Sequence, residues 1–177
     1  MRRLAYLLLL LGAASVPGRP GEAARPSPPF TILRPNGPAV RLSQYRGKVV
    51  AVAFIQTECP HCQQLTTELN LIAADYKDRG VQILECAFDV NAAAALPRFL
   101  ERFKPPFPVG YSTTAAVMAY LQYTIIDPRP MTVPQMVFLD RTGVIRAQYA
   151  GESEFFRDPG PNVRMQLEKM AGAGKRR

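Results

Sequence analysis

Two of the three cysteines in the 177-residue sequence are separated by only two residues, in the motif Cys59-Pro60-His61-Cys62. Two thiols at this spacing lie about one turn apart on a helix, so they can form and open a disulfide with little movement of the chain. Pro60 suits a first helical turn, where its missing N–H group costs nothing. His61 is the only histidine, and an imidazole inside such a motif can stabilise a neighbouring thiolate. We therefore expect a redox-active disulfide between Cys59 and Cys62.

The segments on either side of the motif determine which thiol attacks. Residues 49–55 form a continuous apolar run that is typical of a strand buried on both faces. Apolar residues then recur every three or four positions between residues 60 and 79, which predicts a helix. Cys59 would precede this helix, where unpaired N–H groups and the helix dipole favour a thiolate. We expect Cys59 to be the exposed, attacking thiol and Cys62 the shielded, resolving one.

Other uses of these cysteines fit the sequence less well. A purely structural disulfide between Cys59 and Cys62 would close too small a loop to stabilise the fold much. Haem attachment requires a histidine after the second cysteine, where the chain has Gln63, and a zinc site lacks a second ligand pair. Cys86 lies within an apolar run and is expected to be an inert, buried thiol. We expect neither a metal nor a dissociable cofactor.

The remaining pattern predicts an α/β fold. A second apolar run, 81–88, follows the helix, and strand–helix–strand at these lengths implies a right-handed βαβ crossover. Turn residues separate paired strands at both ends of the chain. Further elements are expected as follows: a hairpin of 30–33 and 40–42, helices 92–103 and 113–123, a short strand 107–109, a hairpin of 135–139 and 144–149, and a helix 162–170 capped by Asn162. The prediction is a mixed central β-sheet flanked by helices, in one domain spanning residues 30–171.

The two ends of the chain carry targeting and tail signals. Residues 1–23 combine a basic start, a short apolar stretch and small residues, which is typical of a secretory signal peptide, with an uncleaved membrane anchor as the alternative. The proline-rich residues 24–29 are expected to be an extended spacer outside the sheet, and residues 172–177 a basic tail. The net charge of +8 is spread along the chain and does not indicate nucleic-acid binding. We expect a periplasmic or otherwise extracytoplasmic location.

The chain resembles the thioredoxin-like superfamily, in particular its exported TlpA- and ResA-like thiol–disulfide oxidoreductases, which are related to the AhpC/TSA group. The resemblance covers about residues 29–152. It is carried by Leu42-Ser-Gln-Tyr-Arg-Gly-Lys-Val-Val50, by Cys59-Pro-His-Cys62, by an inserted helical segment around 91–110, and by Val133-Pro134-Gln-Met-Val-Phe-Leu-Asp140. It implies that Pro134 follows a cis peptide bond and lies against the dithiol. It also implies that Val133 and Pro134 bind an extended segment of a partner protein.

Several positions depart from the patterns of this superfamily. The tryptophan that precedes the first cysteine in thioredoxins is Glu58 here. The two places where the superfamily holds an acid that serves the resolving thiol are occupied by Ala53 and Leu65. Glu58 and Glu85 are candidate replacements for that acid, although Glu58 could be a solvated surface residue and Glu85 a charge at a strand edge.

These observations predict an exported thiol–disulfide oxidoreductase that exchanges disulfides with protein partners, including a redox partner protein. The Pro-His pair and Val133 resemble the oxidant DsbA, whereas the overall resemblance favours a reductase, so the direction of exchange stays open. Two alternatives remain. A copper-binding chaperone would use the cysteine pair as ligands, although no distant histidine is available. A peroxiredoxin-like antioxidant would need proline and threonine where the chain has Val52 and Gln56.

Overall fold

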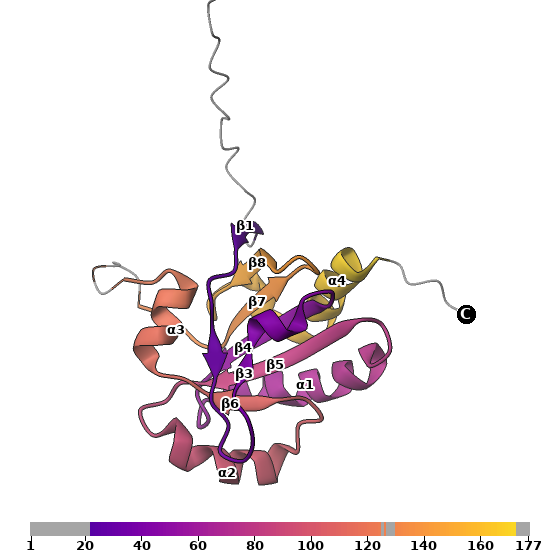
Figure 1. Ribbon diagram of the computed structural model, residues 1–177. Helices are drawn as coiled ribbons and strands as arrows, with labels where there is room; N and C mark the ends of the chain where they lie inside the picture. Colours follow the sequence, from indigo (N-terminus) through magenta and orange to yellow (C-terminus); the bar gives the residue numbers. More distant parts are fainter. Residues whose placement is uncertain (1–21, 125, 127–129, 173–177) are drawn as a thin grey trace, which may run out of the picture.

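A mixed, six-stranded sheet forms the centre of the molecule in a computed structural model, which describes residues 22–124, 126 and 130–172 (Figure 1). The order of the strands across the sheet is β1-β8-β7-β4-β5-β6. These strands are β1 (Glu22–Pro26), β4 (Val49–Ile55), β5 (Val81–Ala87), β6 (Val109–Tyr111), β7 (Gln135–Leu139) and β8 (Val144–Tyr149).

The predicted βαβ unit is confirmed. All seven residues of β4 are buried, and the strand pairs in parallel with β5 and antiparallel with β7. Helix α1 (Pro60–Tyr76) connects β4 to β5 and buries Leu65, Leu69 and Ile72, which recur at helical spacing. Because β4 is covered on both faces, its carboxyl end is held rigidly at the point where the cysteine motif begins.

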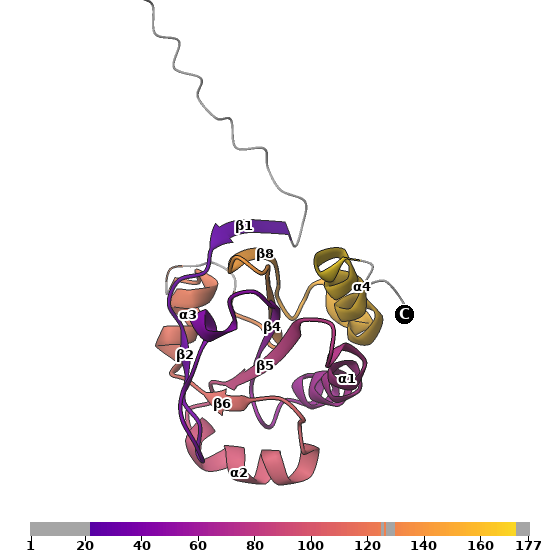
Figure 2. The ribbon, with the colours of Figure 1, turned by 45° about the vertical axis from the view of Figure 1, so that its right-hand side comes forward.

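Helices cover both faces of the sheet (Figure 2). One face packs against α1, α2 (Ala92–Phe103) and α4 (Pro159–Ala171), and the 3-10 turn η2 (Glu154–Arg157) adds Phe155 to the same core. The opposite core contains residues of α3 (Thr114–Leu121), of the short hairpin of β2 (Thr31–Ile32) and β3 (Val40–Arg41), and of the 3-10 turn η1 (Leu42–Tyr45). The predicted α/β fold with a mixed sheet flanked by helices is therefore present, and β2 and β3 pair as predicted.

The prediction that residues 24–29 would stay outside the sheet is wrong for residues 24–26, whereas residues 27–29 lie outside it. Residues 22–26 form β1, which pairs antiparallel with β8 at the edge of the sheet. Arg25 Nη2 donates hydrogen bonds to Tyr120 O at 3.0 Å and to Gln148 Oε1 at 2.8 Å. An exposed sheet edge offers unpaired backbone groups to any extended segment nearby, so this strand depends on its partner more than on its own proline-rich sequence.

Three further boundaries differ from the predictions. Helix α4 begins at Pro159 with Asp158 as its N-cap, because proline is well placed in the first turn. Asn162 lies inside the helix instead and donates its Nδ2 to Phe155 O at 2.9 Å. Strand β6 covers Val109–Tyr111 rather than 107–109, and α3 is shorter than expected, with Thr113 as its N-cap.

The predicted end segments lie largely outside the described residues. Of the proposed signal peptide, 1–23, only the last two positions are described, and they begin β1. Of the proposed basic tail, 172–177, only Gly172 is described. Within the described parts of the chain, no helix combines the length and the apolar character needed to cross a membrane.

Candidate active site

The cysteine motif lies where β4 passes into α1, at the carboxyl edge of the parallel strands. The loop before Cys59 is held by several hydrogen bonds. The amide of Thr57 donates to both carboxylate oxygens of Asp89 at 2.9 Å, and Gln63 Nε2 donates to Thr57 O at 2.8 Å. Cys59 N donates to Gln56 O at 3.1 Å. Asp89 follows β5, so a residue from the neighbouring strand end fixes the position of the first thiol.

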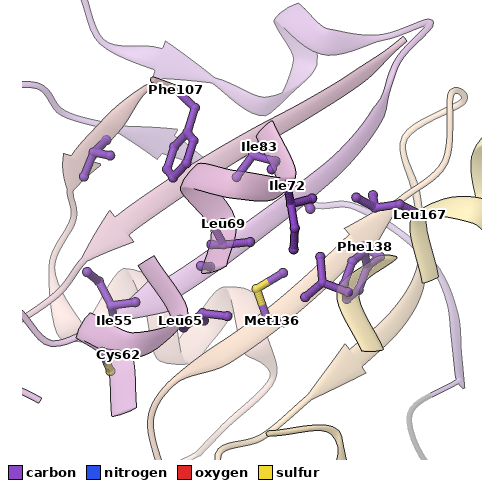
Figure 3. Close-up of a cluster of buried hydrophobic side chains, with 14 of the residues drawn as sticks. Ile55, Cys62, Leu65, Leu69, Ile72, Ile83, Phe107, Met136, Phe138 and Leu167 are labelled. Atoms are coloured by element: carbon purple, nitrogen blue, oxygen red, sulfur yellow. The ribbon is translucent and has the colours of Figure 1, made fainter. Parts of the chain in front are cut away.

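The two thiols of the motif differ in their environment. Cys59 is the N-cap of α1 and is partly exposed, and its Sγ accepts a hydrogen bond from Cys62 N at 3.4 Å. Cys62 is 0% exposed and lies beside Ile55 and Leu65 at the end of the core (Figure 3). Burial raises the pKa of the Cys62 thiol well above its ordinary value, and its hydrogen bond with Cys59 raises it further. Only Cys59 is therefore placed to react with a large molecule.

The predicted cis peptide bond is present between Val133 and Pro134. Pro134 is buried, Val133 is partly exposed, and the side chain of Gln135 donates Nε2 to Thr132 O at 2.7 Å. Gly151 approaches this loop so closely that a Cβ atom there would lie 2.6 Å from Val133 O. The loop is thus held between Gln135 on one side and the backbone at Gly151 on the other.

A surface groove joins this loop to the cysteine motif. His61 is exposed in the first turn of α1 and forms part of the groove wall, as do Val133 and Pro134. The structure therefore brings the predicted motif and the predicted substrate-binding pair to one place. The groove is lined by His61, Gln64, Thr132, Val133, Pro134, Gly151, Glu152, Ser153, Glu154, Phe156 and Arg157. A second, smaller pocket between the N-terminal segment and η1 has neither cysteine in its lining.

The two acids considered as replacements for the missing one have different surroundings. Glu58 is exposed to solvent beside the motif. Glu85 is 0% exposed on the face of the sheet that α1 covers, so it is not a charge at an exposed strand edge. Thr66 Oγ1 lies 2.7 Å from Glu85 Oε1. Sequence reasoning missed Thr66, because only the packing of α1 on β5 shows that the two side chains meet.

Cys86 is 0% exposed on β5, as the sequence predicted. Its side chain belongs to the core on the other face of the sheet from Cys62. Burial raises the pKa of this thiol above its ordinary range, and the charge of Glu85 raises it further. Nothing in this environment favours a thiolate.

Comparison with known proteins places these features in a family. The Redoxin family model matches residues 21–159. The thiol–disulfide oxidoreductase ResA of Geobacillus kaustophilus is 36% identical over 126 residues, which cover 71% of this chain and 67% of the relative. The ResA of Bacillus thuringiensis subsp. konkukian is 24% identical over 158 residues, covering 85% of this chain and 87% of the relative.

Solved structures show the same fold. A putative thiol:disulfide interchange protein DsbE from Chlorobium tepidum superposes with a TM-score of 0.70 at 21% identity, covering 87% of this chain and 100% of that one. A putative protein disulfide isomerase from Bacteroides thetaiotaomicron gives a TM-score of 0.67 at 24% identity, covering 86% and 90%. The fold is thioredoxin-like, as predicted. The chain belongs to the redoxin family, as a thiol–disulfide oxidoreductase of the ResA-like kind.

Proposed function

We propose that this protein exchanges disulfides with partner proteins outside the cytoplasm, with Cys59 as the nucleophile and Cys62 as the resolving thiol. The observation that carries the assignment is the contrast between the two sulfurs. Cys59 is partly exposed at the N-terminus of α1, whereas Cys62 is sealed in the core. Attack by Cys59 on a partner disulfide joins the two proteins, and attack by Cys62 on Cys59 Sγ then releases the partner as a dithiol.

A protein substrate is favoured by the shape of the groove beside the dithiol. The groove extends from His61 along Val133 and Pro134 to η2, which suits an extended segment better than a compact small molecule. Among the described residues, the main-chain groups of Val133 have no hydrogen-bond partner. They are thus available to pair with the backbone of a bound segment, as in the addition of a strand to a sheet edge.

Export is proposed from the N-terminal sequence alone. Its basic start, apolar stretch and small residues match a signal peptide, and an extracytoplasmic compartment allows a dithiol to cycle through its disulfide. Mass spectrometry of the protein from its native host should find a chain that starts near residue 24. A chain that retains Met1 in the membrane fraction would instead indicate an anchor.

The decisive experiment compares three cysteine variants in an exporting host. Cys62→Ser retains the nucleophile but removes the resolving thiol, so mixed disulfides with partner proteins should accumulate on non-reducing gels. Cys59→Ser should trap almost nothing. Cys86→Ser is the matched control and should behave as the wild type. Trapping by Cys59→Ser rather than by Cys62→Ser would reverse the assignment, and no trapping by either would refute exchange with proteins.

The copper-chaperone alternative has its own measurement. Among residues 22–124, 126 and 130–172, no group of three or more histidine, cysteine or acidic side chains is arranged to hold a metal ion. Reduced protein from a copper-supplemented host should carry far less than one equivalent of copper. A stoichiometric load would favour the alternative.

A further inference from the structure

Glu85 is the one acidic side chain among the described residues that is buried in the core of the sheet. It lies beneath α1, between Ala53 on β4 and Val109 on β6, which are its neighbours across the strands. Leu96 of α2 belongs to the same apolar cluster. A carboxyl group is costly to bury among such residues, so its retention there calls for a compensating role or partner.

The hydrogen bonding around Glu85 changes with its protonation state. Thr66 Oγ1 lies 2.7 Å from Glu85 Oε1 and 3.0 Å from Cys62 O. A hydroxyl group has one proton to donate, so both contacts are hydrogen bonds at once only when the carboxyl supplies its own proton. When Glu85 is ionised, the Thr66 hydroxyl can turn its proton to the carboxylate. Thr66 is therefore able to support both states.

Two features leave Glu85 ready to take a proton. Its Oε2 atom is buried and has no hydrogen-bond partner among the described residues. Burial raises the pKa of the carboxyl to about 8, although the Thr66 hydrogen bond lowers it. A group with a pKa near the working pH is effective both in accepting and in returning a proton.

Cys62 is the group that needs such a partner. Its thiol must lose a proton before it can attack Cys59 Sγ, and it is 0% exposed, so bulk water does not reach it. The charge of Glu85 raises the pKa of the thiol, although less than burial and the Cys59 contact do. Thr66 links the two residues, because its Oγ1 contacts both Cys62 O and Glu85 Oε1. The charge of Glu85 also raises the pKa of Cys86, whose side chain lies in the core on the opposite face. Strands β4 and β6 contain no charged residue, and the charged side chains of α2, Arg98, Glu101 and Arg102, are exposed to solvent.

We propose that Glu85 is the proton acceptor for Cys62, directly or across one water, and that Thr66 positions its carboxyl under the first turn of α1. The proposal rests on the exchange function proposed above. In the mixed disulfide, the Cys62 thiol gives its proton to the Glu85 carboxylate. The Cys62 Sγ–Cys59 Sγ bond forms, the bond from Cys59 Sγ to the partner sulfur breaks, and the partner leaves as a thiolate. The dithiol is oxidised by two electrons and the partner is reduced. In the reverse reaction, the protonated Glu85 returns its proton to the departing Cys62 thiolate.

The test uses the reduced, full-length protein and the aromatic disulfide dithiobis(nitrobenzoate). This probe releases one coloured thiolate when Cys59 attacks it and a second when Cys62 resolves the adduct, so the two steps are measured separately. Glu85→Gln should leave the first phase unchanged. It should slow the second phase by about a hundredfold, the lower end of what a positioned acid–base group contributes. The pH dependence of the second phase that is due to the carboxyl should disappear.

Matched variants separate proton transfer from packing. Thr66→Val should slow the second phase and Thr66→Ser should restore it, because serine keeps the hydroxyl. Glu58→Gln, which changes the exposed acid next to the motif, should leave both phases at the wild-type rate. A second phase in Glu85→Gln with the wild-type rate and pH profile would overturn the proposal.

Two further observations keep the result unambiguous. If Glu85→Gln does not fold, the titration of Glu85 in the wild-type protein, measured by carbon-13 NMR of its carboxyl group, tests the proposal instead. Titration of Glu85 near neutral pH, shifted when Cys62 is oxidised, supports the proposal, and titration in the ordinary glutamate range refutes it. Absence of the first phase in the wild-type protein would count against the exchange function itself, which is a separate result.

Discussion

Glu85 on β5 lies directly opposite Ala53 on β4 in the parallel register of the two central strands. Both side chains point to the face of the sheet that α1 covers. Position 53 is one of the two positions where the resemblance to the thioredoxin-like superfamily predicts a buried acid. In this chain the buried acid, Glu85, lies on the neighbouring strand instead. The small side chain of Ala53 leaves its neighbour with no competing polar group across the strand pair.

The pairing of these two residues predicts that a carboxyl group at position 53 can partly replace that of Glu85. Glu85→Ala alone should slow the resolution of the mixed disulfide, as Glu85→Gln does. The double variant Ala53→Glu with Glu85→Ala keeps the total side-chain volume of the pair and presents a carboxyl from the neighbouring strand, so it should recover part of the lost rate. The measurement is the second phase of the reaction with the aromatic disulfide. A double variant as slow as Glu85→Ala, but equally stable, would show that the position of the acid on β5 and its contact with Thr66 are both essential.

The buried carboxyl also predicts a specific dependence of stability on pH. The pKa of Glu85 rises from an ordinary 4.5 to about 8 in the folded protein. The folded state therefore binds the proton more tightly, and this stabilisation is complete below pH 4.5 and is lost as the pH rises through about 8. Urea denaturation of the reduced protein should show the free energy of unfolding falling over this window, by a few kcal/mol at most. In Glu85→Gln this decrease should be absent, and an unchanged decrease would assign it to other groups.

The close approach of Gly151 to Val133 predicts that the substrate groove is sensitive to a single methyl group. In Gly151→Ala the new Cβ would lie 2.6 Å from the backbone oxygen of Val133, and backbone atoms cannot turn aside as a side chain can. The displaced loop should lower the rate of exchange with a protein disulfide by about ten- to a hundredfold, because misplacing a positioning group by about 1 Å can cost that much.

Gly160→Ala is the matched control for this change. Its Cβ would approach Glu68 Oε2 at 2.6 Å, but that atom is the end of a flexible side chain, and neither Gly160 nor Glu68 lines the groove. The control should exchange at the wild-type rate. Equal rates in Gly151→Ala and the wild type would show that the Val133 loop does not position the substrate.

The sequence predicts much of this fold because its strongest signals are local. The apolar run of β4, the periodicity of α1 and the turn after β7 each depend on neighbouring residues alone, and each is found where expected. Strand β1 was missed because its formation depends on the free edge of β8, which is distant in sequence. A proline-rich segment has little tendency to form a strand without such a partner.

The sequence likewise predicts some residues of the candidate site and not others. The cysteine motif was evident from spacing, and the positions of Val133 and Pro134 followed from the resemblance to a known superfamily. The sequence left Glu58 and Glu85 as equal candidates for the missing acid, because burial distinguishes them and burial depends on how α1 packs on β5. Asp89, which accepts the amide hydrogen of Thr57, gave no signal in the sequence beyond its place after an apolar run.

The burial of two of the three cysteines predicts selective alkylation. Cys62 and Cys86 are both 0% exposed, whereas Cys59 is partly exposed. Brief treatment of the reduced, native protein with iodoacetamide should modify Cys59 alone, and the other two thiols should react only after denaturation. Peptide mass spectrometry locates the modified residue. Rapid modification of Cys62 in the native protein would mean that the first turn of α1 opens in solution.

The exposed position of His61 predicts that it influences the redox potential more than the fold. His61 lies in the first turn of α1, between the two cysteines in the sequence, and is exposed to solvent. An imidazole inside the motif can stabilise the Cys59 thiolate and therefore the reduced form of the protein. His61→Gln should lower the reduction potential of the Cys59–Cys62 couple by some tens of millivolts, where about 30 mV corresponds to 1.4 kcal/mol.

Gln64→Ala, which alters an exposed neighbour on the same groove, is the control and should leave the potential unchanged. Equilibration with glutathione buffers measures both. The wild-type value also decides the direction of exchange, because a potential near that of thioredoxin favours reduction of partners and one near that of DsbA favours their oxidation. A potential that His61→Gln does not move would assign control of the thiolate to the N–H groups at the start of α1 instead.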